Sequence, residues 1–341
     1  MPIIAPDLGI DLGTSYTSIY VRGRGIVVNE PSLVVLNAAD RQHVLAVGDE
    51  ARFLMGRTPE TLVPVFPIRA GTLSDFDTAE IMLRYFVRKA IGVSRLIKPR
   101  IIVSTPCNIT DVQRKALTEA LIRAGGKHVI LVEKPFAAAL GCGLPVYDPV
   151  GSMVADIGAG TTDVALISLG GTVVGQSIPV GGDRMDEAIM NYIRQECSLM
   201  IGRQTAESIK KDLASAMPLE QSRVIPVRGV SRLNTSADIV DFSSTQAYEA
   251  IREACSAILN SLKWVLERTP PELAADIMRN GVHLTGAGSC LFALDNYFSS
   301  ALGIPVILAQ NPADCTITGI GYLTENIQTL MPQDQKAIYT D

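Results

Sequence analysis

The stretch that decides the fold is Met153-Val-Ala-Asp-Ile-Gly-Ala-Gly-Thr-Thr-Asp-Val-Ala165. Its apolar start predicts a buried strand that delivers Asp156 to a turn of small residues. Two hydroxyl residues, Thr161 and Thr162, follow the turn, and a second apolar run predicts the returning strand. Small residues let backbone N–H groups approach an anion closely, and neighbouring hydroxyls add donors. The stretch therefore predicts a phosphate-binding hairpin, in which Asp156 holds a magnesium ion through water.

The same device occurs near the start of the chain, in Leu8-Gly-Ile-Asp-Leu-Gly-Thr-Ser15. Here Asp11 ends the strand, and Gly13, Thr14 and Ser15 follow as the turn. Either copy alone is also typical of an ordinary hairpin turn. Because the two aspartates lie 145 positions apart (156 minus 11), the pair indicates an internal duplication with a nucleotide between the two halves.

Composition limits the class of protein. The 341 residues suggest two domains of typical size or one bilobed fold. With 47% hydrophobic and 19% charged residues, the chain can bury a large core, and a net charge of −5 argues against nucleic acid as the main partner. Six cysteines without a C-x-x-C pair, beside three histidines, indicate reduced cytosolic thiols rather than metal ligands or disulfides. No apolar run reaches the roughly 18 residues of a membrane span.

Apolar periodicity predicts an α/β chain in which strands and helices alternate. Beyond the two hairpins, the expected strands cover residues 25–28, 100–104, 127–133, 173–180, 281–285 and 305–308. The expected helices cover residues 49–55, 75–91, 111–124, 136–141, 183–196, 205–216 and 244–267, and a last helix begins near residue 316. Residues 32–67 and 200–245 are interpreted as excursions from the main sheets, the second of them polar and weakly patterned.

Two further features could contact a nucleotide. The glycine turn Gly286-Ala-Gly288 follows a strand and suits the close approach of a ligand, although an ordinary strand-to-helix turn has the same composition. Glu207 and Lys210, three positions apart on one helical face, could hydrogen-bond a ribose and flank a purine. A solvated salt bridge between these two side chains is the alternative.

Two phosphate hairpins, a helix after each and a late glycine turn form the pattern of the actin-like ATPases. Shorter motifs resemble MreB, the bacterial actin that guides cell-wall elongation, from about Leu8 to Leu323. These motifs are Gly48-Asp-Glu-Ala51, Gly56-Arg-Thr-Pro59, Gly151-Ser-Met-Val154, Gly182-Asp-Arg-Met-Asp-Glu-Ala-Ile189, Thr269-Pro-Pro-Glu-Leu-Ala-Ala-Asp-Ile-Met278 and Leu284-Thr-Gly-Ala-Gly288.

The resemblance implies an actin-like duplicated α/β fold with two lobes, each built on a mixed five-stranded sheet flanked by helices, and four subdomains. Subdomain IA would hold residues 1–31, 68–147 and 316–341, and subdomain IB would hold residues 32–67. Subdomain IIA would hold residues 148–181 and 247–315, and subdomain IIB would hold residues 182–246. ATP or ADP would lie with Mg²⁺ at the bottom of the cleft between the lobes. Asp11 and Asp156 would hold the metal. The nucleotide-binding residues would be Gly13, Thr14, Ser15, Tyr16, Gly158, Ala159, Gly160, Thr161, Thr162, Gly182, Glu207, Lys210, Gly286, Ala287 and Gly288.

The resemblance also implies a filament-forming cytoskeletal protein that sets rod shape. Its partners would be further copies of itself in paired protofilaments, an anionic membrane surface, the cell-wall elongation machinery and other MreB paralogues, but not nucleic acid. It would lie in the cytoplasm, peripherally at the inner face of the plasma membrane. Two alternatives stay open: a non-polymerising or weakly polymerising ATP-binding regulator of another MreB, and a small-molecule kinase of the same superfamily.

One departure from the family pattern concerns catalysis. Lys134 stands where MreB-type proteins carry a glutamate that is thought to orient the attacking water, whereas Thr161, the other residue associated with that water, is retained. An ammonium has no acceptor for a hydrogen bond from water, so we expect slow hydrolysis. Lys134 could instead hold the γ-phosphate as a point charge, or it could be a drifted surface residue. Glu133 keeps an acidic group nearby.

Three other positions depart from the pattern. Ala159 and Ala287 replace the middle glycines of two family turns, and Tyr16 stands where the family usually has an asparagine. Alanine is tolerated where φ is negative, but it costs roughly 1–2 kcal/mol where φ is positive.

The loop from Gly92 to Arg100 resembles the membrane-touching loop of the family. It places Leu96 and Ile97 between Arg95 and Lys98. Each base contributes about 1 kcal/mol at an anionic surface, and a filament would present many copies of the loop. The alternative is that the two aliphatic side chains pack into the core.

Overall fold

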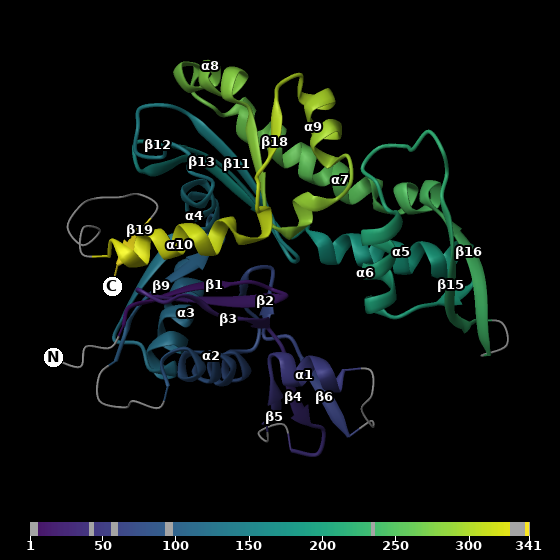
Figure 1. The fold of residues 1–341 in the computed structure, drawn as a ribbon, viewed down its shortest axis with the longest axis horizontal. Coiled ribbons are helices and arrows are strands. Elements are labelled where there is room, and N and C mark those ends of the chain that lie inside the picture. The colour runs from purple at the N-terminus through teal and green to yellow at the C-terminus, as the bar shows by residue number, and fades with distance from the viewer. Residues whose placement is uncertain are drawn as a thin grey trace.

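Two β-sheets with the same strand plan form the centre of the structure (Figure 1). The computed structural model describes residues 6–40, 44–55, 61–92, 98–232, 236–327 and 338–340. The first sheet has the order β19-β10-β9-β1-β2-β3 and the second the order β13-β12-β11-β17-β18. The strands of the first sheet are β1 (Leu8–Leu12), β2 (Tyr16–Val21), β3 (Gly25–Pro31), β9 (Arg100–Thr105), β10 (His128–Glu133) and β19 (Ile338–Thr340). Those of the second are β11 (Ser152–Ile157), β12 (Thr162–Ser168), β13 (Gly171–Ile178), β17 (Val282–Thr285) and β18 (Val306–Leu308).

The two sheets repeat one pairing scheme. β1 pairs antiparallel with β2 and parallel with β9, just as β11 pairs antiparallel with β12 and parallel with β17. The next strands continue the scheme in both sheets, antiparallel in β3 and β13 and parallel in β10 and β18. This confirms the duplicated actin-like fold with a mixed five-stranded sheet in each lobe. β19 adds a short sixth strand at the edge of the first sheet.

Helices cover both sheets and fill the space between them. α2 (Phe76–Ile91) and α3 (Asp111–Ala124) pack on the first sheet, while α7 (Ser244–Glu267), α8 (Pro271–Asn280) and α9 (Leu294–Leu302) pack on the second. α4 (Lys134–Gly141) and α10 (Cys315–Glu325) lie together between the sheets and bury one apolar cluster with strands of both. Capping boxes begin α3 and α7, which is why both helices have the bounds that the sequence predicts.

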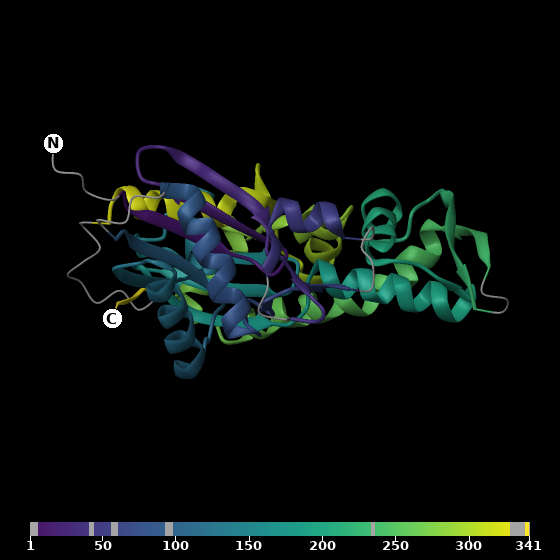
Figure 2. The same ribbon diagram turned by 90° about the horizontal axis from the view of Figure 1, so that it is seen from below.

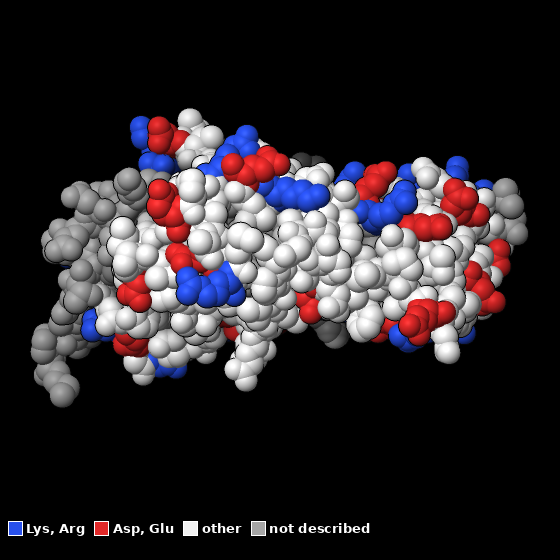
Figure 3. Space-filling model, turned by 90° about the horizontal axis from the view of Figure 1, so that it is seen from above, with Lys and Arg blue, Asp and Glu red and all other residues white. Residues whose placement is uncertain are grey.

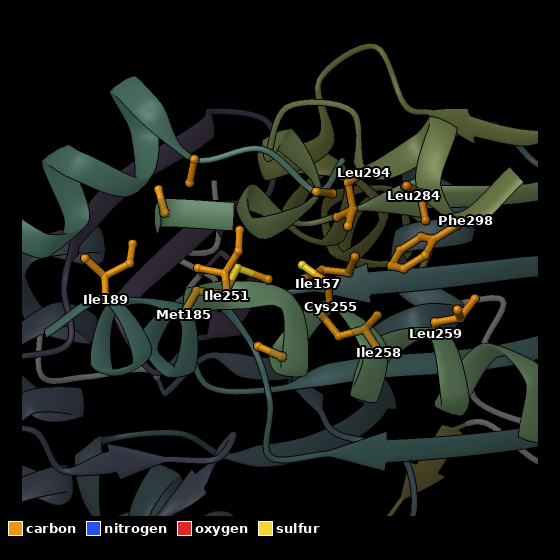
Figure 4. Packing of buried hydrophobic residues seen from close by; sticks show 14 of the residues in the cluster. Ile157, Met185, Ile189, Ile251, Cys255, Ile258, Leu259, Leu284, Leu294 and Phe298 are labelled. Atoms are coloured by element: carbon orange, nitrogen blue, oxygen red, sulfur yellow. The ribbon is translucent and has the colours of Figure 1, made fainter. Parts of the chain in front are cut away.

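The core of the second lobe continues into its outer unit. Figure 4 shows Ile157 of β11, Leu284 of β17 and Phe298 of α9 in one cluster with residues of α7 and of α5 (Gly182–Glu196). α5 therefore shares a single hydrophobic core with the second sheet, and this core fixes the position of its N-terminus.

Each lobe carries an outer unit. The first contains β4 (Val34–Asn37), β5 (Val44–Val47), α1 (Asp49–Leu54) and β6 (Leu62–Val65), and the two-residue strands β7 (Ile68–Arg69) and β8 (Thr72–Leu73) follow it. The second contains α5, β14 (Leu199–Met200), α6 (Arg203–Leu213), β15 (Val224–Ser231) and β16 (Ala237–Ser243), and it projects beyond the sheets in Figure 2. Two short 3₁₀ helices, η1 (Ala287–Cys290) and η2 (Pro312–Asp314), complete the described elements. The bounds of the four subdomains stay a prediction.

Two strand regions differ from the sequence prediction. The strand β6, which contains Pro64, was not predicted from the sequence; it is an edge strand, where a missing N–H is tolerated. The β15–β16 hairpin was not predicted. Most of its side chains are exposed, so it lacks a clear apolar pattern, and β15 contains Pro226 and Gly229. Among the described residues, no helix has both the length and the apolar character needed to cross a membrane.

Candidate functional site

The two glycine turns close in the same way. In the first, the N–H of Gly13 donates to the carbonyl of Tyr16 at 3.0 Å, and in the second the N–H of Gly158 donates to the carbonyl of Thr161 at 2.8 Å. The two turns also touch, because a Cβ added at Gly160 would lie 2.4 Å from Oγ1 of Thr14. The structure therefore brings the two predicted phosphate hairpins together.

The aspartates that end the two leading strands are held by hydroxyls from the neighbouring parallel strands. Ser104 of β9 donates to Oδ1 of Asp11 at 2.6 Å, and Thr285 of β17 donates to Oδ1 of Asp156 at 2.9 Å. Burial raises the pKa of Asp156 to about 6, against the opposing effects of a nearby lysine and of this hydrogen bond. Each lobe thus places one carboxylate, oriented by one hydroxyl, at the base of its turn.

A third carboxylate, Asp163 on β12, was not predicted. It is fully buried and accepts hydrogen bonds from the backbone N–H of Cys107 at 2.9 Å and from Oγ1 of Thr161 at 3.1 Å. Burial raises its pKa above the ordinary value. Thr161 is therefore oriented by a buried acid. The sequence feature that could have predicted this acid is an aspartate at the start of the apolar run that follows the second glycine turn.

Lys134 lies inside this acidic cluster. Its side chain is buried, and Nζ lies 3.2 Å from Oδ1 of Asp11. Burial lowers the pKa of Lys134, but the attraction of the three carboxylates outweighs burial, so its pKa is raised above the ordinary value. Lys134 is thus a charged group of the cluster, and the alternative of a surface residue does not hold.

Glu133 lies outside the ion pair of Asp11 and Lys134, although it is within electrostatic reach of Asp163. It ends β10 and accepts a hydrogen bond from Oγ1 of Thr172 at 2.6 Å. Burial is the main cause that raises its pKa, and the Thr172 hydrogen bond opposes the shift. At the end of a strand successive side chains face opposite sides, so Glu133 and Lys134 occupy different environments.

The cluster suits a divalent cation held through water. Three carboxylates and one ammonium sum to −2 formal charges (−3 plus 1), and Asp156 and Asp163 are both less than 10% exposed. Within the described part of the chain, no group of three or more His, Cys, Asp or Glu side chains has the geometry of a direct metal site. Mg²⁺ keeps several waters and is usually bound through one or two carboxylates, a number that Asp11 and Asp156 could supply.

The N-terminus of α5 is bonded to the second turn. The N–H of Gly182 donates to the carbonyl of Gly158 at 3.0 Å, and that of Asp183 to the carbonyl of Ala159 at 2.8 Å. Lys210 of α6 also holds the N-terminus of α5, because its Nζ donates to the carbonyl of Gly182 at 2.9 Å. Neither Ala159 nor Ala287 has a positive φ, so alanine is unstrained at both positions.

The third turn packs on the end of β11. Gly286 has φ 79°, and a Cβ there would lie 2.3 Å from the carbonyl oxygen of Ile157. A Cβ at Gly288 would lie 2.6 Å from the side chain of the same Ile157. A side chain at either glycine would prevent this approach, which places the turn beside the second predicted phosphate turn.

Glu207 and Lys210 do not pair with each other. Glu207 forms an ion pair with Lys211 at 2.6 Å, whereas Lys210 forms one with Asp186 at 2.8 Å. Glu207 instead lines a cavity of about 460 Å³ between α6 and the end of α1. The other lining residues are Arg52, Phe53, Met55, Gln204, Ser208 and Lys211. None belongs to the acidic cluster, so this cavity lies between the two outer units and is separate from the cluster.

Two other predicted site residues have different positions. Tyr16 is exposed and its hydroxyl accepts a hydrogen bond from Arg52 of α1, so its side chain turns toward the first outer unit. Of the predicted membrane loop, Arg95, Leu96 and Ile97 lie outside the described residues, and Lys98 is exposed. Across the cleft, the guanidinium of Arg203 lies 5.6 Å from the ring centre of Phe66.

Comparison with known proteins agrees with this geometry. The sequence profile of the MreB/Mbl protein family matches residues 5–332. The chain is 44% identical to the cell shape-determining protein Mbl of Bacillus subtilis (strain 168) over 328 residues, which cover 96% of this chain and 98% of Mbl. It is 43% identical to the cell shape-determining protein MreB of Escherichia coli (strain K12) over 325 residues, covering 94% of each.

Solved structures of related proteins also match this chain over nearly its whole length. The crystal structure of MreB 5 of Spiroplasma citri bound to AMPPNP matches with a TM-score of 0.90 and 33% identity, covering 97% of this chain and 99% of that one. The MamK double helical filament matches with a TM-score of 0.76 and 21% identity, covering 93% and 98%, which supports the fold alone. The chain therefore belongs to the MreB/Mbl family of actin-like cell-shape proteins.

Proposed function

We propose that this chain binds ATP with Mg²⁺ between its lobes, polymerises, and hydrolyses ATP slowly. The observation that carries the proposal is the ion pair between Lys134 and Asp11 at 3.2 Å, in an acidic cluster at the ends of the two strands, β1 and β11, that lead into the glycine turns. The relative from Spiroplasma citri carries AMPPNP or ADP in its structures, which supports a nucleotide at this position.

Each part of the cleft has its own binding task. The turns at residues 13–15 and 158–161 would bind phosphates through backbone N–H groups and hydroxyls, as small residues allow. Asp11 and Asp156 would hold Mg²⁺ through water, and the ion would screen the phosphates. Glu207, which lines the cavity between α6 and α1, would hydrogen-bond the ribose.

Slow hydrolysis follows from the orientation of the acids. A water that attacks phosphate needs an acceptor within hydrogen-bond reach, and positioning by a general base contributes about 10²–10⁴-fold. Lys134 supplies only donors, and Glu133 already accepts a hydrogen bond from Thr172. Thr161 can contact the water, but its hydroxyl is already bonded to Asp163. Lys134 would therefore retain the triphosphate, as a lysine does in acting as a point charge on phosphate.

Polymerisation and membrane contact complete the proposal. The relatives are cell shape-determining proteins, and full-length similarity supports a role in cell-wall elongation and rod shape at the inner face of the plasma membrane. Lys98 is exposed at the end of the predicted membrane loop. Figure 3 shows Lys and Arg beside Asp and Glu in small mixed groups on one face, and not the basic stripe of a nucleic-acid binder.

The test of the nucleotide site is Asp156→Ala. ATP with Mg²⁺ should raise the Tm of the wild-type chain, and Asp156→Ala should abolish the metal-dependent part of that rise. Asp148→Ala is the matched control, because Asp148 is an exposed acid on the connection before β11. Unchanged Mg-ATP protection in Asp156→Ala would overturn the assignment.

Pelleting then tests polymerisation. The wild-type chain should sediment with ATP in the absence of other proteins. If it sediments only with an added MreB, the chain is a regulator of that MreB and not a filament former. Release of ADP that depends on an added sugar would indicate a kinase.

A further inference from the structure

Two cysteines meet where the chain passes between the lobes. Cys142 follows the last residue of α4, and Cys315 is the first residue of α10. Their Sγ atoms lie 3.3 Å apart, although the residues are 173 positions apart in sequence. Cys142 is half-buried and Cys315 is 5% exposed. The pair was not predictable from cysteine spacing.

The backbones at this point are already in contact. A Cβ added at Gly141 would lie 1.9 Å from the carbonyl oxygen of Cys315, and one added at Gly319 would lie 1.8 Å from that of Ala137. α4 and α10 therefore cross with glycine at the point of closest approach. A disulfide bond is about 2 Å long, so the two sulfurs need to approach by only about 1 Å more. Side-chain rotation can supply that distance without displacing either helix.

Of the two cysteines, Cys315 is the one whose pKa is lowered, although its thiol also donates to the carbonyl oxygen of Asn311 at 3.3 Å, a bond that opposes the thiolate. Cys315 lies in the first turn of an eleven-residue helix, where unpaired N–H groups stabilise a negative charge. The thiol of Cys142 donates a hydrogen bond to Sγ of Cys315, which lowers the pKa of Cys315 below its ordinary value. Cys142 is the more exposed of the two, so a small oxidant can reach the pair from its side.

We propose that Cys142 and Cys315 are a reversible dithiol–disulfide site, oxidised by hydrogen peroxide or another hydroperoxide. The Cys315 thiolate attacks one peroxide oxygen, the O–O bond breaks, and hydroxide takes the released proton and leaves as water. The sulfur of Cys142 then attacks the sulfenic sulfur of Cys315, the S–S bond forms, and a second water leaves. Two thiols and one hydrogen peroxide give one disulfide and two waters, and two electrons pass from sulfur to peroxide.

The bond would join the two connections between the lobes. One connection runs from α4 to β11, and the other runs from β18 through η2 to α10. A covalent link between them restricts rotation of one lobe relative to the other. The chemistry of the site is independent of the proposed nucleotide function. Its consequence rests on that function, because nucleotide exchange requires the cleft to open.

The experiment treats the full chain with hydrogen peroxide, blocks the remaining thiols and maps its peptides by mass. The wild-type chain should lose two hydrogens, yield a peptide that joins Cys142 to Cys315, lose two of its six thiols when they are counted after unfolding, and recover them with dithiothreitol. Cys142→Ser and Cys315→Ser should lose the linked peptide. Cys197→Ser, which removes a thiol at the end of α5, should retain it.

Oxidised wild-type protein that carries only separate sulfenic or sulfinic acids, or that links other cysteines equally well, would overturn the site. Release of a fluorescent ATP analogue is then compared in oxidised and reduced wild-type protein, and slower release on oxidation is expected. Equal release rates with the link present would overturn its effect on the cleft. Failure of the reduced protein to bind the analogue would overturn the nucleotide proposal instead, and the linked peptide would still decide the site.

Discussion

Replacing Lys134 by glutamate tests the proposed cause of slow hydrolysis. The substitution removes a buried ammonium 3.2 Å from Asp11 and adds an acceptor at the same place. At an effective dielectric constant of about 20, an ion pair at that distance is attractive by about 5 kcal/mol. A fourth carboxylate changes this attraction into a repulsion of similar size. Without nucleotide, Lys134→Glu should therefore have a lower Tm than the wild-type chain, and Mg²⁺ should recover part of the loss.

With Mg-ATP, the same substitution should speed hydrolysis. The glutamate can accept a hydrogen bond from the attacking water, which Lys134 cannot. We expect a rise of at least tenfold, a conservative part of the roughly 10²–10⁴-fold that such positioning contributes. Phosphate release is measured at equal filament mass, so that a change in polymerisation is not counted as a change in chemistry.

The control is Lys134→Met, which removes the charge at similar length and adds no acceptor for water. Its rate should stay near that of the wild-type chain. If Lys134→Met is as fast as Lys134→Glu, loss of the positive charge is the cause and not the new acceptor. A wild-type rate equal to that of Lys134→Glu would refute the reasoning, and a collapse in Glu133→Ala alone would move the role to Glu133.

Three further predictions concern other parts of the chain. Gly160→Ala should weaken nucleotide binding, because its Cβ would lie 2.4 Å from a hydroxyl of the facing turn, whereas Gly158→Ala meets nothing closer than 3.3 Å. Equal affinities in a titration would contradict this. Leu96→Ser with Ile97→Ser should reduce co-sedimentation with anionic liposomes and leave the fold intact, and no binding by polymerised wild-type protein would end the loop hypothesis. Burial lowers the pKa of His283, so the folded state disfavours its charged form, and the stability that it contributes is lost as pH falls through about 6.5. The wild-type Tm should therefore fall more than that of His283→Leu between pH 7.5 and about 5.5, and parallel curves would exclude this cause.

The sequence predicts those parts of the site that local pattern carries. A strand, an aspartate and a glycine turn are adjacent in the chain, so Asp11, Asp156 and both turns could be located without coordinates. The repeat of this unit then predicts the duplicated fold, because two similar halves bury similar sheets. Helices with capping boxes at Thr110 and Ser243 have the bounds that their patterns predict.

Contacts between distant segments could not be predicted in this way. The sequence identifies Lys134 as a departure, but its ion pair with Asp11 depends on the parallel arrangement of β10, β9 and β1. Likewise, helical spacing suggests that Glu207 faces Lys210, whereas in the folded chain Lys210 forms an ion pair with Asp186. The approach of Cys142 to Cys315 depends on two helices that different halves of the chain contribute.

The buried charges connect binding with catalysis. Removing Lys134 alone would leave two buried carboxylates and the partly exposed Asp11 without a compensating positive side chain, and the cost would depend on a bound cation. With Lys134 present, one of the three charges is compensated before nucleotide binds, so the cleft depends less on the metal for its stability. The same ammonium is then available to the terminal phosphate and withholds an acceptor from water. One residue can therefore strengthen the retention of ATP through its charge and slow hydrolysis through its lack of an acceptor, so Lys134→Glu should change both properties and Lys134→Met should change retention alone.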